Sequence, residues 1–270
     1  MLQLLVGFGA RTKPKLEAIT LKLEVAIRGV LFQHSKSYSG VTILPMRVFT
    51  AILLAFSLVT AAAAQKNIAI PVEDGGTVYA DVYGSGVRGV VLAHGGRFNK
   101  ESWAKQAEAL SAAGFRVLAF DFRGYGNSTG PGQADPLGAP LHLDVLAAVR
   151  YLRHMGVTSI AVVGGSMGGS AAGDAEIASR PGEIDRVVFL GATPNEPADK
   201  LKCPSLFIVA REDTSGDGPR LPGIKKQYEK APEPKKLVVL DGSAHAQYLF
   251  QTEQADRVMR EILKFLNENP

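Results

Sequence analysis

The stretch Ser159-Ile160-Ala161-Val162-Val163-Gly164-Gly165-Ser166-Met167-Gly168-Gly169-Ser170-Ala171-Ala172 joins a β-branched run, a glycine-flanked serine and a small-residue segment. The run at residues 159–163 is typical of a buried strand, and the small residues at the end of the stretch favour a helix. Gly164, Ser166 and Gly168 stand between them with G-x-S-x-G spacing, which predicts a strained strand-to-helix turn. Such a turn lifts the serine hydroxyl clear of the sheet, so Ser166 is the candidate nucleophile.

The composition indicates a globular protein with one main domain. The 270 residues are 46% hydrophobic and 21% charged, which allows one substantial core. The net charge is only +4, and several basic residues precede Met46, so we expect no nucleic-acid partner. Cys203 is the only cysteine, which excludes an internal disulfide and a cysteine metal motif. His142 and Asp144 are two positions apart on a predicted helix and point away from each other, so we expect no metal. Gly84, Gly86 and Gly89 have G-x-G-x-x-G spacing but precede a strand instead of linking a strand to a helix, so we expect no cofactor.

A candidate export signal lies in the first quarter of the chain. Arg47 supplies a basic residue, residues 48–58 are almost wholly apolar, and the alanines at 61–64 match an A-x-A cleavage site. We therefore expect a signal peptide at residues 46–64 with cleavage before Gln65. The protein is then secreted or periplasmic and has no stable membrane association. An uncleaved membrane anchor is the alternative.

The 45 residues before Met46 do not fit this scheme, because a signal peptide belongs at the N-terminus. We expect translation to start at Met46, which makes residues 1–45 a mis-assigned extension, and the folded domain to be residues 65–270. A real pre-domain with a helix at residues 15–31 is the alternative. N-terminal sequencing of the exported protein decides between them, since a start within residues 1–45 contradicts the first reading.

Apolar patterning predicts eight strands, of which the last six alternate with helices. The strands are expected at residues 67–72, 77–83, 89–93, 116–120, 159–163, 186–190, 205–210 and 236–240. The helices are expected at residues 102–113, 142–155, 170–179, 224–230 and 252–266. Turn residues between the first two strands indicate a hairpin. This order predicts an α/β fold with a mostly parallel sheet, helices on both faces and a hairpin at one edge. Ligands then bind at the carboxyl ends of the strands.

Two further residues complete a candidate catalytic triad. A serine hydroxyl needs an adjacent base, and that base needs an acid to orient it. His245 is the only histidine after Ser166 and lies just past the last strand, while Asp213 follows the seventh strand. Asp217 and Glu196 are the alternative acids. The order Ser, Asp, His, each at the carboxyl end of a strand, predicts a nucleophile, an orienting acid and a base.

An acyl-transfer site also needs amide donors for the oxyanion of its tetrahedral intermediate. The amide of Met167, the residue after the nucleophile, is the first candidate donor. The second is expected in the loop after the third strand, at Gly96 with Arg97 as the alternative. His94 in the same loop is expected to pack as a structural residue and not to act as a base.

These motifs together resemble the α/β-hydrolase superfamily over residues 67–265. The resemblance rests on His94-Gly95-Gly96, Asp121-Phe122-Arg123-Gly124-Tyr125-Gly126-Asn127-Ser128, Gly164-Gly165-Ser166-Met167-Gly168-Gly169, Asp213 and Gly242-Ser243-Ala244-His245. It implies a serine hydrolase that works through an acyl-enzyme intermediate, and we expect the substrate to be a small-molecule carboxylic ester. It also implies that residues 121–128 are structural. A serine at position 166 makes the chain look unlike the dehalogenase and epoxide hydrolase branches.

The substrate class is less closely defined, because this fold hosts esterases, thioesterases and peptidases. Many relatives insert a helical cap after the sixth strand, but only residues 191–204 separate the sixth and seventh strands here. We therefore expect an open, shallow site, partly walled by residues 124–141, that favours small or short-chain acyl esters. A thioesterase, a serine peptidase and a non-catalytic binding module are the alternatives. The sequence does not indicate the oligomeric state.

Overall fold

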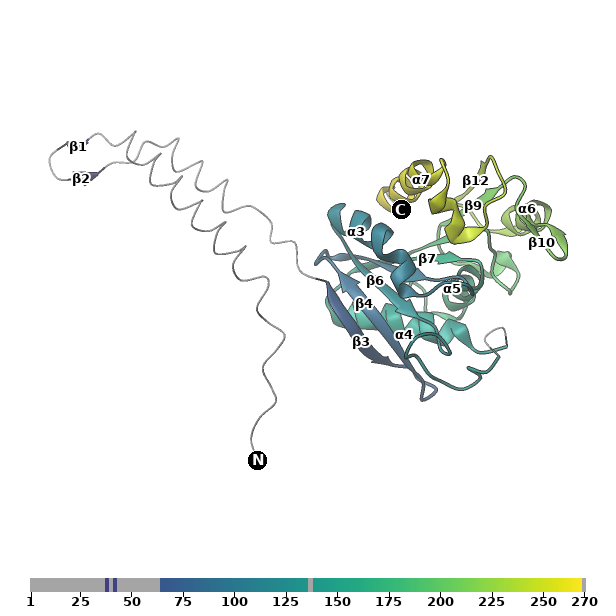
Figure 1. Cartoon of the computed structure of the whole chain (residues 1–270), viewed down its shortest axis with the longest axis horizontal. Helices are drawn as coiled ribbons and strands as arrows, with labels where there is room; N and C mark the ends of the chain where they lie inside the picture. The colour runs from purple at the N-terminus through teal and green to yellow at the C-terminus, as the bar shows by residue number, and fades with distance from the viewer. Residues whose placement is uncertain (1–36, 39–40, 43–63, 136–137, 269–270) are drawn as a thin grey trace, which may run out of the picture. The chain divides into compact units, whose positions relative to one another are not determined.

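The computed structural model describes residues 37–38, 41–42, 64–135 and 138–268 (Figure 1). In the first of two compact units, β1 (Ser37–Tyr38) pairs antiparallel with β2 (Val41–Thr42). Apart from these four residues and Ala64, the expected extension and signal peptide lie outside the described residues. In the part of the chain that the structure describes, no helix is both long and apolar enough to cross a membrane.

The second unit, Ala61–Pro270, contains an eight-stranded sheet with helices on both faces. Its strands are β3 (Gln65–Pro71), β4 (Thr77–Tyr83), β5 (Arg88–Ala93), β6 (Phe115–Asp121), β7 (Ser159–Gly165), β8 (Arg186–Leu190), β9 (Ser205–Ala210) and β12 (Lys235–Leu240). Its helices are η1 (Lys100–Trp103), α3 (Ala104–Ala112), α4 (Leu141–His154), α5 (Met167–Ala178), η2 (Ala198–Lys200), α6 (Arg220–Lys230), η3 (Ala246–Gln251) and α7 (Ala255–Asn267). A separate small hairpin joins β10 (Thr214–Ser215) and β11 (Gly218–Pro219).

The strand order is β12-β9-β8-β7-β5-β6-β4-β3. The strands from β12 to β6 run parallel, while β4 is antiparallel to both β6 and β3. The predicted fold, a mostly parallel sheet with a hairpin at one edge, is confirmed. β7, the strand that leads into Ser166, lies between β5 and β8 near the middle of the sheet.

Two hydrophobic cores lie on opposite faces of this sheet. Along β7, Ile160 and Val162 belong to one buried cluster, whereas Ala161 and Val163 belong to the other. Successive side chains of a strand point to opposite faces, so an uninterrupted apolar strand supplies both cores. The first cluster is covered by α4, α5 and α6, and the second by α3 and α7 (Figure 1).

The structure differs from the sequence prediction in several local features. Helix α6 begins at Arg220 and not at residue 224. Helix α5 begins at Met167 and not at residue 170, because the amides of Gly169 and Ser170 both donate to the carbonyl oxygen of Ser166, at 2.8 and 3.0 Å. The helix predicted at residues 252–266 is preceded by the 3-10 turn η3 and starts later, as α7. The hairpin of β10 and β11 was not predicted, since each of its strands has only two residues.

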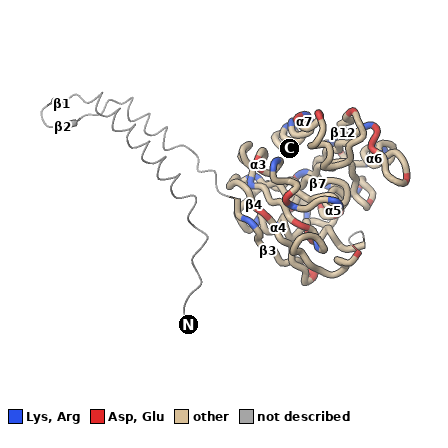
Figure 2. Tube along the Cα trace, viewed as in Figure 1, with Lys and Arg blue, Asp and Glu red and all other residues tan. Residues whose placement is uncertain are grey.

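Charged residues are distributed over the second unit without strong segregation by sign. Figure 2 shows Lys and Arg positions interspersed with Asp and Glu positions along the described chain. The single cysteine, Cys203, is 8% exposed, and burial raises the pKa of its thiol. Because a thiolate is the reactive form of cysteine, this residue is a small buried side chain of low reactivity.

Candidate active site

The register of the parallel strands brings several loops to one edge of the sheet. Ala93 of β5 pairs with Gly164 of β7, and Ala210 of β9 pairs with Leu240 of β12. Each pair stands at or next to the carboxyl end of its strands, so the loops that follow start from a common edge. These loops carry all the predicted site residues, which are Gly96, Ser166, Met167, Asp213 and His245.

Ser166 occupies a strained turn between β7 and α5. Its φ of 51° and ψ of −121° lie where residues with a side chain are rarely found, at a cost of about 1–3 kcal/mol. The neighbouring glycines allow the close packing that holds it there. A Cβ at Gly164 would lie 2.3 Å from the carbonyl oxygen of Gly168, and a Cβ at Gly168 would lie 2.3 Å from that of Ala93. The G-x-S-x-G spacing therefore has a steric cause.

The structure brings Ser166, His245 and Asp213 into one hydrogen-bonded chain. The hydroxyl of Ser166 donates to Nε2 of His245 at 2.8 Å, and Nδ1 of His245 donates to Oδ2 of Asp213 at 2.8 Å. The Asp213 side chain is 1% exposed, whereas the His245 side chain is 25% exposed. This arrangement can take up the serine proton and hold the resulting imidazolium beside a buried carboxylate. Within the described residues, the alternative acids Asp217 and Glu196 make no hydrogen bond with His245.

Two residues that the sequence analysis did not identify lie against the Asp213–His245 pair. Nε of Arg220 is 3.4 Å from Oδ1 of Asp213, and the Arg220 amide donates to the Asp213 carbonyl oxygen at 2.9 Å. Gly191 has a φ of 59°, and a Cβ there would lie 2.9 Å from Nδ1 of His245. Neither could be singled out beforehand, because the chain has 29 glycines and Arg220 depends on the β10–β11 hairpin.

The candidate oxyanion donors have amides available for a substrate. Among the hydrogen bonds of the described residues, the amides of Gly96, Arg97 and Met167 donate to no acceptor. The Gly95 amide, by contrast, donates to Oε1 of Gln247 at 2.6 Å. A Cβ at Gly96 would lie 3.7 Å from Sδ of Met167, so the loop after β5 adjoins the start of α5. Either Gly96 or Arg97 can therefore supply the second oxyanion donor beside the amide of Met167.

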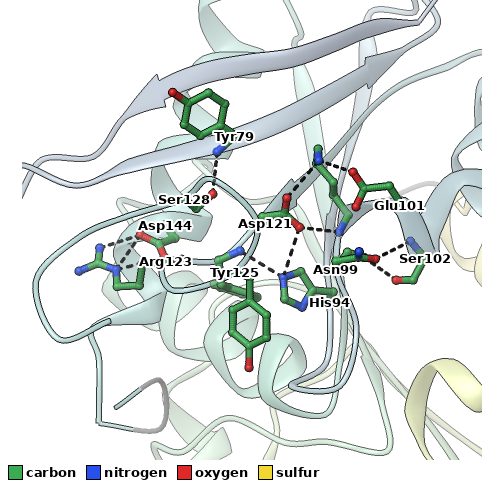
Figure 3. A network of polar contacts seen from close by, with 12 residues as sticks. Tyr79, His94, Asn99, Glu101, Ser102, Asp121, Arg123, Tyr125, Ser128 and Asp144 are labelled. Atoms are coloured by element: carbon green, nitrogen blue, oxygen red, sulfur yellow. Dashed lines mark hydrogen bonds and ion pairs between the residues drawn. The ribbon is translucent and has the colours of Figure 1, made fainter. Parts of the chain in front are cut away.

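His94 supports this loop from within the core (Figure 3). Its Nδ1 donates to the carbonyl oxygen of Gly95 at 2.9 Å, and its Nε2 accepts from the amide of Phe122 at 3.1 Å. The ring is fully buried, and this burial lowers the pKa of His94 below its ordinary value of 6.5. A neutral imidazole with one N–H matches the two bonds. His94 is therefore a buried structural residue, as the sequence predicts.

This burial leads to a prediction about acid stability. Because the unfolded chain gains a proton on His94 near pH 6.5 and the folded protein only at lower pH, stability falls as the pH drops below about 6.5. The contribution of this residue is at most about 1.4 kcal/mol per pH unit. Urea unfolding of the wild type and of His94→Gln at pH 7.5, 6.5 and 5.5 measures it. The free energy of unfolding is expected to fall more steeply with acid in the wild type, and parallel curves would contradict the assignment.

Residues 121–128 form a structural connection between β6 and the rest of the fold (Figure 3). Asp121 accepts from the Lys100 amide at 2.7 Å, and the Lys100 ammonium lies 3.1 Å from its other oxygen. The hydroxyl of Ser128 accepts from the Tyr79 amide at 2.8 Å, which ties the segment to β4. These buried contacts join the segment to η1 and β4 and support the interpretation of its motif as structural.

Comparisons with known proteins agree with this architecture. A model of the alpha/beta hydrolase fold matches residues 89–267. The chain is 28% identical over 186 residues to Protein ABHD14A of Danio rerio, a match that covers 66% of this chain and 65% of that protein. It is 28% identical over 125 residues to a non-heme haloperoxidase of Rhodococcus erythropolis, covering 46% of this chain and 44% of that protein. An esterase of Pyrococcus furiosus has a TM-score of 0.61 at 21% identity, with 75% of this chain and 93% of that chain covered.

The matches differ in what they show. The chain spans less than half the length of several curated relatives, and the likeness to the solved esterase shows the fold alone. The family match, however, covers well over half of the chain and runs from β5 to α7. It includes every residue of the candidate site. The chain therefore belongs to the α/β-hydrolase family.

Proposed function

We propose that this chain is a serine hydrolase that cleaves carboxylic esters with small acyl groups. The observation that carries the proposal is the pair of 2.8 Å hydrogen bonds that joins Ser166 to His245 and His245 to Asp213 at the carboxyl edge of the sheet. The strained backbone at Ser166 adds to it, because such strain is concentrated at functional sites. Met167 follows the same serine, a Cβ at Gly96 would lie 3.7 Å from its Sδ, and among the described residues neither amide has an acceptor.

In the proposed reaction, Oγ of Ser166 attacks the ester carbonyl carbon while its proton moves to Nε2 of His245. Asp213 stabilises the imidazolium, and the amides of Met167 and Gly96 or Arg97 donate to the oxyanion. The C–O bond to the alcohol then breaks, and His245 returns the proton to the leaving alcohol. Water, deprotonated by His245, hydrolyses the acyl-enzyme, which releases the carboxylic acid and restores the Ser166 hydroxyl.

The surroundings of the serine favour small substrates. The connection between β8 and β9, residues 191–204, is fully described and contains only the short turn η2, with no inserted helical cap. The His245 side chain keeps 25% of its surface exposed, so the site is open to solvent. A long acyl chain needs an apolar cleft that shields it from water, which a cap commonly supplies. Short acyl groups do not need such a cleft.

Hydrolysis of p-nitrophenyl esters of increasing acyl length tests this proposal. We expect kcat/KM for dodecanoate to be no higher than for acetate and butyrate, since the longer chain gains no buried contact. Ester concentrations are kept below micelle formation, and the same protein preparation is used throughout. A preference for the long esters would contradict the open site. Turnover of thioesters or peptides alone would keep the triad and replace the substrate class.

Export through a cleaved signal peptide is part of the proposal. The basic, apolar and alanine-rich segments at residues 46–64 support it. Gln65 is the first residue of β3, so cleavage before it would leave all strands of the sheet complete. N-terminal sequencing of protein from the periplasm or medium is expected to read from Gln65. A sequence that starts within residues 1–45 would contradict this part.

A further inference from the structure

We propose that Gln247 is a positioning residue that fixes the oxyanion loop, residues 94–97, to the loop of the catalytic histidine. The inference rests on the proposed serine hydrolase chemistry. Gln247 is 4% exposed and comes two residues after His245. Buried amide side chains are kept where both of their ends find hydrogen-bond partners. In Gln247 both ends do, and one partner belongs to the oxyanion loop.

The side chain of Gln247 contacts three segments, all of them distant from it in the sequence. Its Oε1 accepts from the Gly95 amide at 2.6 Å, and its Nε2 donates to Oγ of Ser102 at 2.7 Å. Its stem lies against the nucleophile turn, since a Cβ at Gly165 would be 3.4 Å from Cγ of Gln247. Ser102 is held in turn by hydrogen bonds with Asn99 (Figure 3). Gln247 thus contacts the oxyanion loop, the serine turn and η1 together.

The reason that the oxyanion loop needs such a partner is its two consecutive glycines, Gly95 and Gly96. Glycine has wide conformational freedom, so the direction of a donor N–H in this loop is fixed only if each peptide plane is held from outside. The plane before Gly95 is held by Gln247 through the Gly95 N–H. The plane between the glycines is held by His94 and the Phe98 amide, which both donate to the Gly95 carbonyl at 2.9 Å.

This second plane also contains the amide of Gly96. In a trans peptide the N–H points opposite to the carbonyl, so a Gly95 carbonyl directed at His94 directs the Gly96 N–H away from the core. The next carbonyl, that of Gly96, accepts from the Tyr125 hydroxyl at 3.0 Å. Gln247, His94 and Tyr125 therefore fix three successive peptide planes. Of these three residues, only Gln247 comes from the segment that carries the catalytic histidine.

The link between Gln247 and His245 is itself rigid. Ala246, between them, is buried and has a φ of 52°, a conformation that alanine adopts only when its surroundings impose it. The carbonyl of His245 accepts from the Tyr248 amide at 3.0 Å, and the rings of Tyr248 and Phe98 lie 4.8 Å apart. The segment that positions the base therefore also holds the first peptide plane of the oxyanion loop, through the bond from the Gly95 amide to Gln247.

The test compares Gln247→Leu with Gln227→Leu. Leucine fills a similar volume but leaves the Gly95 amide without its acceptor. Gln227 is the matched control, because its Oε1 also accepts from a backbone amide, that of Ala198 at 3.2 Å, on α6 away from the site. In Gln247→Leu we expect kcat for p-nitrophenyl acetate to fall by about 10- to 100-fold with KM changed by less than about 3-fold, because the donors act mainly in the transition state.

Two further readouts separate positioning from a loss of folding. An arylboronic acid forms a tetrahedral adduct on the serine, so its affinity should fall by the same factor as kcat. Hydrogen exchange at the Gly95 amide should become faster in Gln247→Leu and stay unchanged in Gln227→Leu. An unchanged kcat in folded Gln247→Leu would overturn the inference. So would an activity loss that is fully explained by a smaller folded fraction, as measured by circular dichroism.

The outcomes also distinguish this inference from the proposed function. If the wild type hydrolyses p-nitrophenyl acetate and Ser166→Ala does not, the function stands, and the kcat of Gln247→Leu decides on positioning. If the wild type hydrolyses no ester, the proposed function fails. The exchange rate of the Gly95 amide then still decides whether Gln247 holds the loop. Slow exchange of the Gly95 amide in Gln247→Leu would refute the positioning role of Gln247, whether or not the wild type hydrolyses esters.

Discussion

Ser166→Ala is expected to reduce kcat for p-nitrophenyl acetate by at least about 10³-fold, with little change in folding. Removal of a triad nucleophile typically costs from 10³- to about 10⁶-fold, because no neighbouring group replaces the lost covalent step. The Ser166 hydroxyl donates to Nε2 of His245 at 2.8 Å, and the alanine variant leaves that nitrogen without its partner. Initial rates with the short ester, corrected for spontaneous hydrolysis, measure the effect.

Ser179→Ala is the matched control for this substitution. Ser179 follows the other end of helix α5, and its hydroxyl donates to the Glu176 carbonyl at 2.7 Å, away from the site. We expect this variant to retain wild-type kcat. If Ser166→Ala hydrolyses p-nitrophenyl acetate as fast as the wild type does, the serine is not the nucleophile for this ester. The assignment of the triad would then be wrong.

Arg123→Ala is expected to destabilise the fold by about 3–5 kcal/mol, the typical effect of breaking a buried ion pair by removing one partner. The Arg123 and Asp144 side chains are both 0% exposed, and Nη2 of Arg123 donates to Oδ1 of Asp144 at 2.6 Å. Burial already raises the pKa of Asp144 above its ordinary value although the guanidinium is beside it. Without the arginine, the carboxylate is left buried without its partner cation (Figure 3).

Urea unfolding at pH 7 measures this loss, with Arg211→Ala as the control. Arg211 also forms an ion pair, with Asp241 at 3.6 Å, but its side chain is 60% exposed. Exposed pairs contribute little to stability, so this variant should unfold at nearly the same urea concentration as the wild type. If Arg123→Ala unfolds at the same urea concentration as Arg211→Ala, the structural role assigned to residues 121–128 would be contradicted.

The sequence alone was sufficient to predict the sheet, because each strand is a short apolar run that must supply two cores. The triad residues could also be identified, since each of Ser166, Asp213 and His245 follows a predicted strand end in a characteristic order. Their approach to 2.8 Å is a property of the register, which places the carboxyl ends of β7, β9 and β12 at one edge. The register could not be derived from local patterns.

The residues that the sequence analysis missed act through contacts between distant segments. Gln247 was singled out only because its side chain reaches Gly95, 152 positions away along the chain, and Arg220 only because the hairpin of β10 and β11 returns the chain to Asp213. Neither has a local motif. A polar residue close to a catalytic candidate and flanked by apolar positions, as Gln247 is, is the kind of signal that could have indicated it.

Labelling with a fluorophosphonate tests the central claim, that Ser166 is an activated nucleophile, most directly. The reagent reacts with a serine whose proton can be taken by an adjacent base, and peptide mass spectrometry identifies the modified residue. We expect one adduct, on the peptide that contains Ser166, and its absence from unfolded protein and from Ser166→Ala. An adduct at another residue, or a folded wild-type protein that remains unlabelled, would contradict the account.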